Sequence, residues 1–84
     1  MKEKIQIILY SKPGCHLCEE MKADMAKADC ADLYELNEIN IESDDALLAR
    51  YHDDIPVLTI NGVEAFKHRL VAEQFRAYLR EFST

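Results

Sequence analysis

The 84-residue sequence contains no tryptophan, only two glycines and two prolines, and no long uncharged run. Chains rich in glycine or proline are typically fibrous or disordered, so their scarcity excludes both classes. The longest charge-free stretches, residues 5–11 and 55–63, fall well short of the roughly 20 apolar residues of a membrane-spanning helix. The N-terminal apolar run is also too short for the core of a secretory signal peptide, and we therefore expect a cytoplasmic protein.

Positive charge is scarce as well, because ten lysines and arginines face sixteen aspartates and glutamates, for a net charge of −6. An acidic chain repels nucleic-acid phosphates and anionic lipid headgroups, so we expect neither nucleic acids nor membranes as partners. With 49% hydrophobic residues, the chain has enough apolar surface for a core. Its length predicts one domain over residues 1–84, which we expect to be a monomer.

The spacing of apolar residues predicts alternating strands and helices. Strands are expected at residues 5–10, 33–41, 57–60 and 63–66, and helices at 15–28, 46–51 and 71–82. The nearly continuous first run predicts a central strand buried on both faces. Ser43 offers a capping side chain before the second helix, and Asn61-Gly62 is a strong hairpin signal.

The order of these elements predicts an α/β fold with a mixed sheet. A strand–helix–strand start favours parallel pairing, whereas a hairpin is antiparallel. We therefore expect a mixed four-stranded sheet with three helices, in the order βαβαββα. Two helices should cover one face of the sheet and the third helix the other.

The chain has three cysteines, an odd number that does not fit a secreted disulfide framework. Cys15 stands at the start of the first predicted helix, where unpaired backbone N–H groups and the helix dipole favour a thiolate. Cys15 is therefore the predicted nucleophile. Cys18, about one turn further on, could attack a mixed disulfide formed at Cys15 and release the substrate thiol. The alternative is a pair of thiols that only pack or stay reduced.

Other side chains near the pair allow two interpretations each. Lys12 is either a solvated turn lysine or a partner of the Cys15 thiolate, and His16 either is exposed or tunes Cys15. We interpret Cys30 as a small buried hydrophobe rather than a regulatory thiol. Aromatic packing, rather than a substrate groove, is the interpretation for Tyr10 and Tyr51.

A metal site is not expected from this set of residues. A structural zinc site needs four ligands. Beyond Cys15 and Cys18, the chain offers only Cys30 and three histidines without paired spacing. A zinc or iron–sulfur site would need a second subunit or an added thiol.

The motif Lys-x-x-Cys-x-x-Cys at residues 12–18, together with Ile-Pro-Val at 55–57, resembles the glutaredoxin branch of the thioredoxin superfamily. More narrowly, the Cys-His-Leu-Cys motif and the Asn-Gly turn resemble small glutaredoxin-like proteins of uncharacterised role. The resemblance implies a thioredoxin-like fold with a cis peptide before Pro56, beside the redox pair. It also implies that Ile55, Pro56 and Lys12 bind the substrate chain.

Together, these features predict a thiol–disulfide oxidoreductase with Cys15 and Cys18 as its catalytic residues. We expect a protein or low-molecular-weight disulfide as substrate and no bound cofactor. Glutathione or a dithiol reductase would supply electrons, although residues 61–66 read Asn-Gly-Val-Glu-Ala-Phe where glutathione-using glutaredoxins carry Gly-Gly and an acid. The alternative is a non-catalytic module that recognises an extended partner segment at an Ile55–Pro56 groove.

Overall fold

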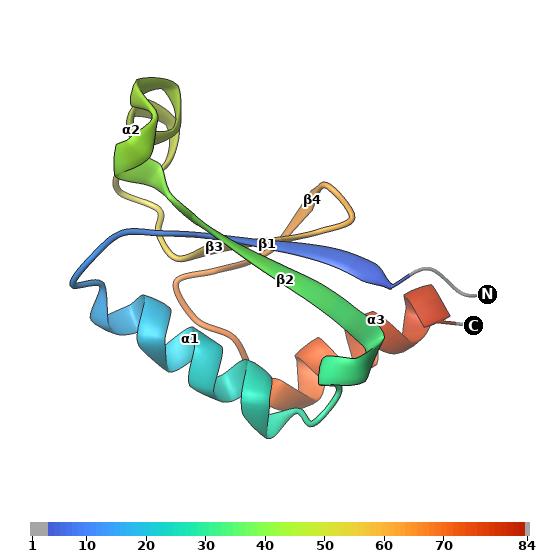
Figure 1. Ribbon diagram of the computed structural model, residues 1–84. Coiled ribbons are helices and arrows are strands. Elements are labelled where there is room, and N and C mark those ends of the chain that lie inside the picture. The colour runs from blue at the N-terminus through green and yellow to red at the C-terminus, as the bar shows by residue number, and fades with distance from the viewer. Residues whose placement is uncertain (1–3, 84) are drawn as a thin grey trace.

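The computed structural model describes residues 4–83, and the elements follow the predicted order (Figure 1). Two short 3-10 helices, η1 and η2, flank the second strand. The elements in chain order are β1 (Ile5–Ser11), α1 (His16–Lys27), η1 (Ala31–Leu33), β2 (Tyr34–Asn40), η2 (Ile41–Ser43), α2 (Asp45–Tyr51), β3 (Val57–Ile60), β4 (Val63–Lys67) and α3 (Ala72–Ser83). Across the described residues, no helix has the length and apolar character needed to cross a membrane.

The four strands form one mixed sheet, as predicted, and their order in it is β2-β1-β3-β4. Strand β1 pairs in parallel with β2 and antiparallel with β3, and β3 pairs antiparallel with β4 through the Asn-Gly turn. The parallel pair needs a crossover, which α1 provides. Because β1 is an inner strand, its carboxyl end lies near the end of β2 and the start of β3.

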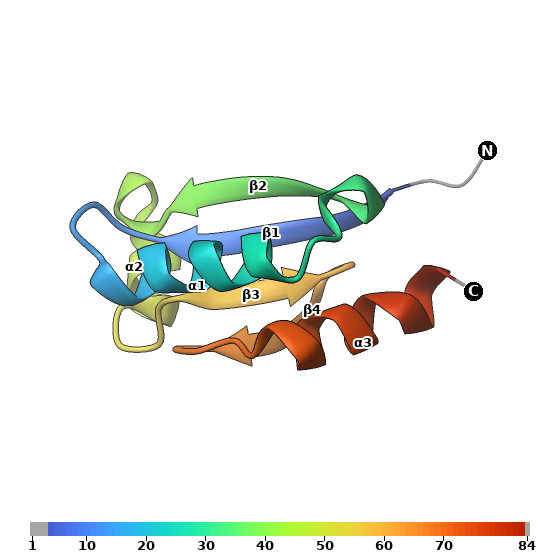
Figure 2. The same cartoon turned by 90° about the horizontal axis from the view of Figure 1, so that it is seen from below.

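Helices α1 and α3 cover one face of the sheet, and α2 lies on the other face at one end (Figure 1, Figure 2). The predicted division of the helices is therefore confirmed. Alternate residues of β1 point toward α1 and α3, because successive side chains of a strand point to opposite faces. The main core contains these residues and the apolar stripes of both helices, including Ile7, Leu9, Met21, Phe75 and Leu79.

A second, smaller core cluster lies under α2. Its buried members are Cys18, Ile41, Tyr51, Ile55 and Val57, against which Tyr10, Cys15 and Leu47 pack. The cluster joins α2 to the carboxyl end of β1 and to the amino end of β3. Both cysteines of the motif thus belong to this second cluster, at one end of the sheet.

The predicted burial of β1 on both faces is wrong. Gln6 is exposed and Ile8 is half-buried, although Ile7 and Leu9 on the opposite face are fully buried. Helix α2 has only seven residues and covers the second face at one end. Among residues 4–83, no other helix lies over that face.

Several predicted element ends also differ from the structure. Leu33 and Ile41 lie in η1 and η2, so β2 is shorter than predicted at both ends. The side chain that caps α2 is Asp44 rather than Ser43, because its carboxylate accepts the N–H groups of Ala46 and Leu47. Val71 fits the apolar stripe of the C-terminal helix by its spacing, but it precedes α3 and is 53% exposed. Its carbonyl accepts the N–H of Phe75 at the start of the helix.

Candidate redox site

Cys15 ends the turn between β1 and α1. Gly14 has a φ of 77°, a left-handed conformation that glycine adopts without the Cβ clash of other residues. The N–H of Cys15 donates to the Lys12 carbonyl over 3.2 Å, which closes the turn. The Cys15 sulfur then caps α1 by accepting the N–H of Cys18 over 3.1 Å. The sulfur therefore lies at the amino end of the helix, as the sequence predicted, and accepts a backbone N–H there, which favours a thiolate.

The two cysteines of the motif differ in accessibility. They are joined by a disulfide, with their Cα atoms 5.3 Å apart. Cys15 is half-buried, whereas Cys18 is only 1% exposed and points into the second core cluster. A disulfide in solution can therefore approach Cys15, while Cys18 is shielded from solvent and bonded to Cys15.

The Ile55–Pro56 segment lies beside the pair, with the cis peptide bond that the resemblance implies. Ile55 belongs to the same cluster as Cys15 and Cys18, and it is only 9% exposed. The Pro56 carbonyl accepts the N–H of His68 over 2.8 Å, which ties this segment to the connection between β4 and α3. The structure thus brings together four of the predicted site residues.

Lys12 and His16 take different positions around the pair. Lys12 is exposed in the turn before Cys15, and its side chain lines a hollow on the β2 side of the turn. The side chain of His16 is 89% exposed, with its Nε2 atom 3.9 Å from a carboxylate oxygen of Glu20 on the outer surface of α1. The His16 side chain therefore points into solvent from the first turn of α1.

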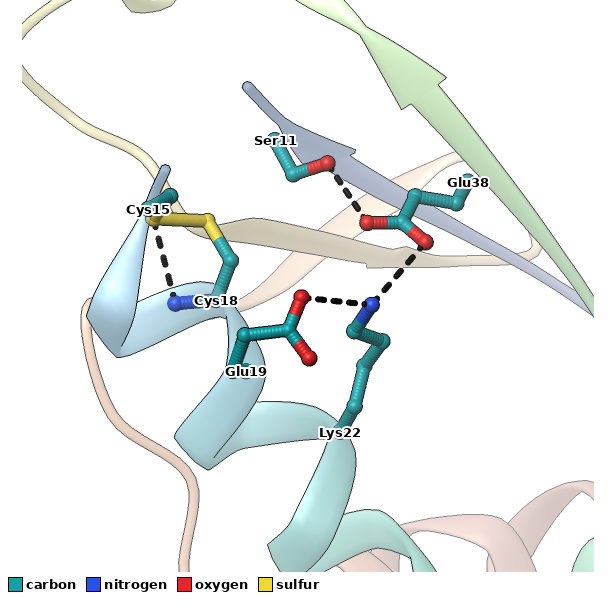
Figure 3. Close-up of a disulfide and its surroundings, with 6 residues drawn as sticks. All are labelled: Ser11, Cys15, Cys18, Glu19, Lys22 and Glu38. Atoms are coloured by element: carbon teal, nitrogen blue, oxygen red, sulfur yellow. Dashed lines mark hydrogen bonds and ion pairs between the residues drawn. A yellow bond between two sulfur atoms is a disulfide. The ribbon is translucent and has the colours of Figure 1, made fainter. Parts of the chain in front are cut away.

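Four side chains form a polar network next to the disulfide (Figure 3), and none of them was among the predicted site residues. Ser11 donates its hydroxyl to Glu38 over 2.7 Å, and Lys22 contacts Glu38 over 3.2 Å and Glu19 over 3.0 Å. The hydrogen bond to Glu19 is the main cause that raises the pKa of Lys22, with Glu38 adding to it, so Lys22 stays charged at neutral pH. The alternation of apolar and polar residues in β2 places Glu38 on one face of the strand. Its position under α1 follows only from its pairing with Leu9.

The two tyrosines pack as predicted, immediately next to the redox pair. The rings of Tyr10 and Tyr51 stack with centroids 4.5 Å apart and planes inclined by 24°. The guanidinium of Arg50 lies 5.2 Å from the centroid of the Tyr51 ring. Tyr51 is 5% exposed, and burial raises the pKa of its hydroxyl. The two rings pack in the second core cluster together with Cys15.

Cys30 is 5% exposed in the main core, which confirms its interpretation as a buried hydrophobe. Burial raises the pKa of its thiol, so the reactive thiolate is scarcer than in a free cysteine at the same pH.

We expect iodoacetamide at pH 7.5 to modify reduced Cys15 in the native protein and to leave Cys30 unmodified until the chain is unfolded. Mass mapping of both peptides over time checks this, and equal rates at the two sites would contradict it.

No group of three or more histidine, cysteine, aspartate or glutamate side chains is placed to hold a metal ion within residues 4–83. Cys15 and Cys18 are bonded to each other, and Cys30 lies in the other core cluster. The three sulfurs therefore belong to two separate environments. What this arrangement can do chemically is exchange one disulfide for another at Cys15.

Comparisons with known proteins agree with this geometry. Residues 6–80 match the family described as Glutaredoxin-like domain (DUF836). Protein Ne2328 from Nitrosomonas europaea is 32% identical, with a TM-score of 0.76 over 93% of this chain and 94% of its own. A structural genomics target protein from X. campestris is 27% identical, with a TM-score of 0.75 over 89% and 96% of the two chains.

More distant structures extend the likeness of the fold. A thioredoxin from Halobacterium salinarum is 11% identical and superposes with a TM-score of 0.66 over 98% of this chain and 77% of its own. A comparison with curated proteins finds no match. The fold is thus thioredoxin-like, and the chain belongs to the family of glutaredoxin-like domains described as DUF836.

Proposed function

We propose that this protein is a thiol–disulfide oxidoreductase that acts through the Cys15–Cys18 pair. The observation that carries the proposal is the asymmetry of the pair, in which a half-buried sulfur caps a helix and a 1% exposed sulfur lies within bonding distance behind it. A pair that only stabilised the fold would not need one sulfur at the surface among thiolate-stabilising donors. The membership of a glutaredoxin-like family supports the same chemistry.

The reaction consists of two exchanges that conserve electrons. The Cys15 thiolate attacks a substrate disulfide, RS–SR′, forms the mixed disulfide Cys15–S–S–R and releases R′S⁻. Cys18 then attacks the Cys15 sulfur, forms the Cys15–Cys18 disulfide and releases RS⁻. The substrate gains two electrons and the protein loses two. A second dithiol, or two thiols, must return the protein to its reduced form.

The substrate class in this proposal is a protein disulfide or a low-molecular-weight disulfide. The proposed contacts are Lys12, in the turn before Cys15, and Ile55 and Pro56, in the segment beside the cysteine pair. The reductant is glutathione or a dithiol reductase, with no resident cofactor. The cytoplasm is the proposed location, because its reducing poise would regenerate the dithiol.

Thiol trapping tests the proposal directly. We expect the number of cysteines alkylated after unfolding in denaturant, where Cys30 also reacts, to fall reversibly from three to one as the ratio of oxidised to reduced glutathione rises, with a single midpoint. Intact-mass analysis at each ratio gives the count, and peptide mapping should place the bond between Cys15 and Cys18. The midpoint then gives the reduction potential of the pair. A glutathione adduct at Cys15 would identify glutathione as a donor.

A different result would point to the second class of function. If all three thiols stay trappable at every ratio, the redox proposal fails over the range of glutathione potentials. Capture of an extended peptide that survives Cys15→Ser would then indicate a binding module at the Ile55–Pro56 segment. The low exposure of both side chains leaves mainly backbone for such a contact.

A further inference from the structure

A hollow of about 380 Å³ lies between α1 and the connection from β4 to α3. Figure 1 shows this connection, in orange, running from the sheet to the start of α3 beside α1. Both segments contribute charged side chains to the lining of the hollow. The lining includes Glu20, Asp24 and Lys27 from α1, and His68, Arg69 and Val71 from the connection. The disulfide exchange at Cys15 does not use any of these side chains.

The hollow adjoins the redox site through His68, whose N–H donates to the Pro56 carbonyl over 2.8 Å. His68 has a φ of 64°, and the Arg69 N–H donates to the Lys67 carbonyl over 2.6 Å across it, which closes a three-residue turn. A residue other than glycine is strained in this conformation, which persists only where the surrounding structure determines it. The turn therefore fixes the backbone of Arg69 one residue away from the contact with Pro56.

The two walls of the hollow carry opposite charges that do not meet. On the α1 wall, Glu20 lies 3.9 Å from His16, and Asp24 lies 3.7 Å from Lys27, so each carboxylate has a partner on its own helix. On the other wall Arg69 is exposed, and it takes part in none of the ion pairs formed within residues 4–83. Its guanidinium can therefore bind a carboxylate from outside the chain.

Most lysines and arginines of the described chain already have a partner on the protein. Those in ion pairs, over an aromatic ring or bonded to a carbonyl are Lys22, Lys27, Arg50, Lys67 and Arg76. With a net charge of −6, the protein as a whole repels anions, so only a local cation attracts one to this place. The planar fork of an arginine matches a carboxylate with two parallel N–H···O bonds. Charge complementarity at Arg69 therefore favours an acidic partner.

The shape of the hollow favours a polypeptide over a small anion. The lining residues on α1 extend from Glu20 to Lys27, which corresponds to about 10 Å of helix. An extended chain covers that length with about three residues. Val71, which is 53% exposed, adds apolar surface at the start of α3 for the side chains of such a segment.

We propose that this hollow binds an acidic segment of a protein substrate, with Arg69 pairing with an aspartate or glutamate within a few residues of the reacting cysteine. This inference rests on the proposed function and names its substrate class, namely protein disulfides flanked by a carboxylate. Arg69 does not touch the reacting sulfurs. It determines specificity, because the ion pair adds to the binding of acidic substrates during the first exchange at Cys15.

The test uses disulfide-linked dimers of short peptides that contain one cysteine. Each peptide carries a single aspartate between one and four positions from the cysteine, on either side, and is matched with a peptide that has asparagine there. Reduced protein is mixed with excess peptide disulfide, and aliquots are quenched with acid and alkylated. Intact mass then gives the rate at which the Cys15–Cys18 disulfide forms, and glutathione disulfide is measured in parallel.

We expect the aspartate peptide to react about 5-fold faster than its asparagine partner for at least one spacing, the upper end of what an exposed ion pair supplies. The ratio should decrease in about 1 M salt, which screens exposed charges. Arg69→Gln should bring the ratio close to one, and Arg69→Lys should keep most of it. Arg69→Glu should reverse the preference, so that a peptide with lysine at the same position reacts faster than the aspartate peptide.

Lys4→Gln is the matched control, because it removes the same charge before β1, at the other end of that strand from Cys15. It should keep the wild-type ratio. The inference is wrong if the ratio is one at every spacing in the wild type, persists in Arg69→Gln, or falls equally in Lys4→Gln. It is also wrong if Arg69→Gln slows glutathione disulfide but not the aspartate peptides, since the ligand is then a small anionic disulfide. A wild-type pair that neither the peptides nor glutathione disulfide oxidise would instead overturn the proposed function.

Discussion

Replacing Cys15 by serine is expected to abolish disulfide exchange, a loss on the order of 1,000-fold or more that reaches the detection limit. The serine hydroxyl is not ionised by the same backbone donors, and no other described thiol is accessible, because Cys18 and Cys30 are 1% and 5% exposed. The measurement is reduction of a small disulfide coupled to a dithiol reductant. The fold should be retained, since serine is a good helix N-cap.

Cys18→Ser is the matched control at the other position of the motif. The variant should keep the attack by Cys15 but lose the resolving step, so stable mixed disulfides accumulate and can be isolated on a non-reducing gel. Their absence from Cys15→Ser samples would show that Cys15 makes the bond. Exchange activity that persists in Cys15→Ser would refute the assignment of the nucleophile.

Phe75→Ala should give the largest loss of stability, about 3–5 kcal/mol. Phe75 is fully buried in the main core, and its ring meets Tyr34 and Phe66 edge-on at centroid distances of 5.6 and 6.1 Å. Truncation removes buried apolar surface and leaves a cavity between α3 and the sheet. Since small domains are stable by only about 5–15 kcal/mol, the variant should unfold at a much lower urea concentration.

Val71→Ala provides the comparison for this loss. Val71 is 53% exposed just before α3, so its truncation should change the free energy of unfolding by no more than about 0.5 kcal/mol. Urea denaturation followed by far-UV circular dichroism measures both variants. Similar midpoints for Phe75→Ala and Val71→Ala would contradict the packing of α3 described above.

The local parts of the fold were predictable because their signals lie within a few residues. Asn61-Gly62 defined a hairpin, and the strand–helix–strand start implied a parallel pair and a mixed sheet. The spacing of Met21 and Met25 identified the buried side of the first helix. The position of Cys15 after a turn and before a helix identified the thiolate-stabilising end, since the donors there belong to the helix itself.

The errors arose where neighbours in space decide the outcome. The apolar character of β1 did not reveal that α2 covers only one end of the second face and leaves Gln6 exposed. Val71 fits the helical stripe by spacing, but the chain enters α3 one residue later. In both cases a periodic pattern indicates which side chains could be buried, whereas burial requires a second element opposite them.

The sequence by itself determined the order of strands and helices, the mixed sheet and a redox motif at a helix start, because each depends on residues that are close together along the chain. Only the tertiary structure decided what surrounds that motif. Ser11 meets Glu38 through a parallel register although the two are 27 positions apart, and Ile55, which follows α2, lies in one cluster with the cysteines. Such contacts depend on how strands pair and helices pack, which no single stretch of the chain encodes.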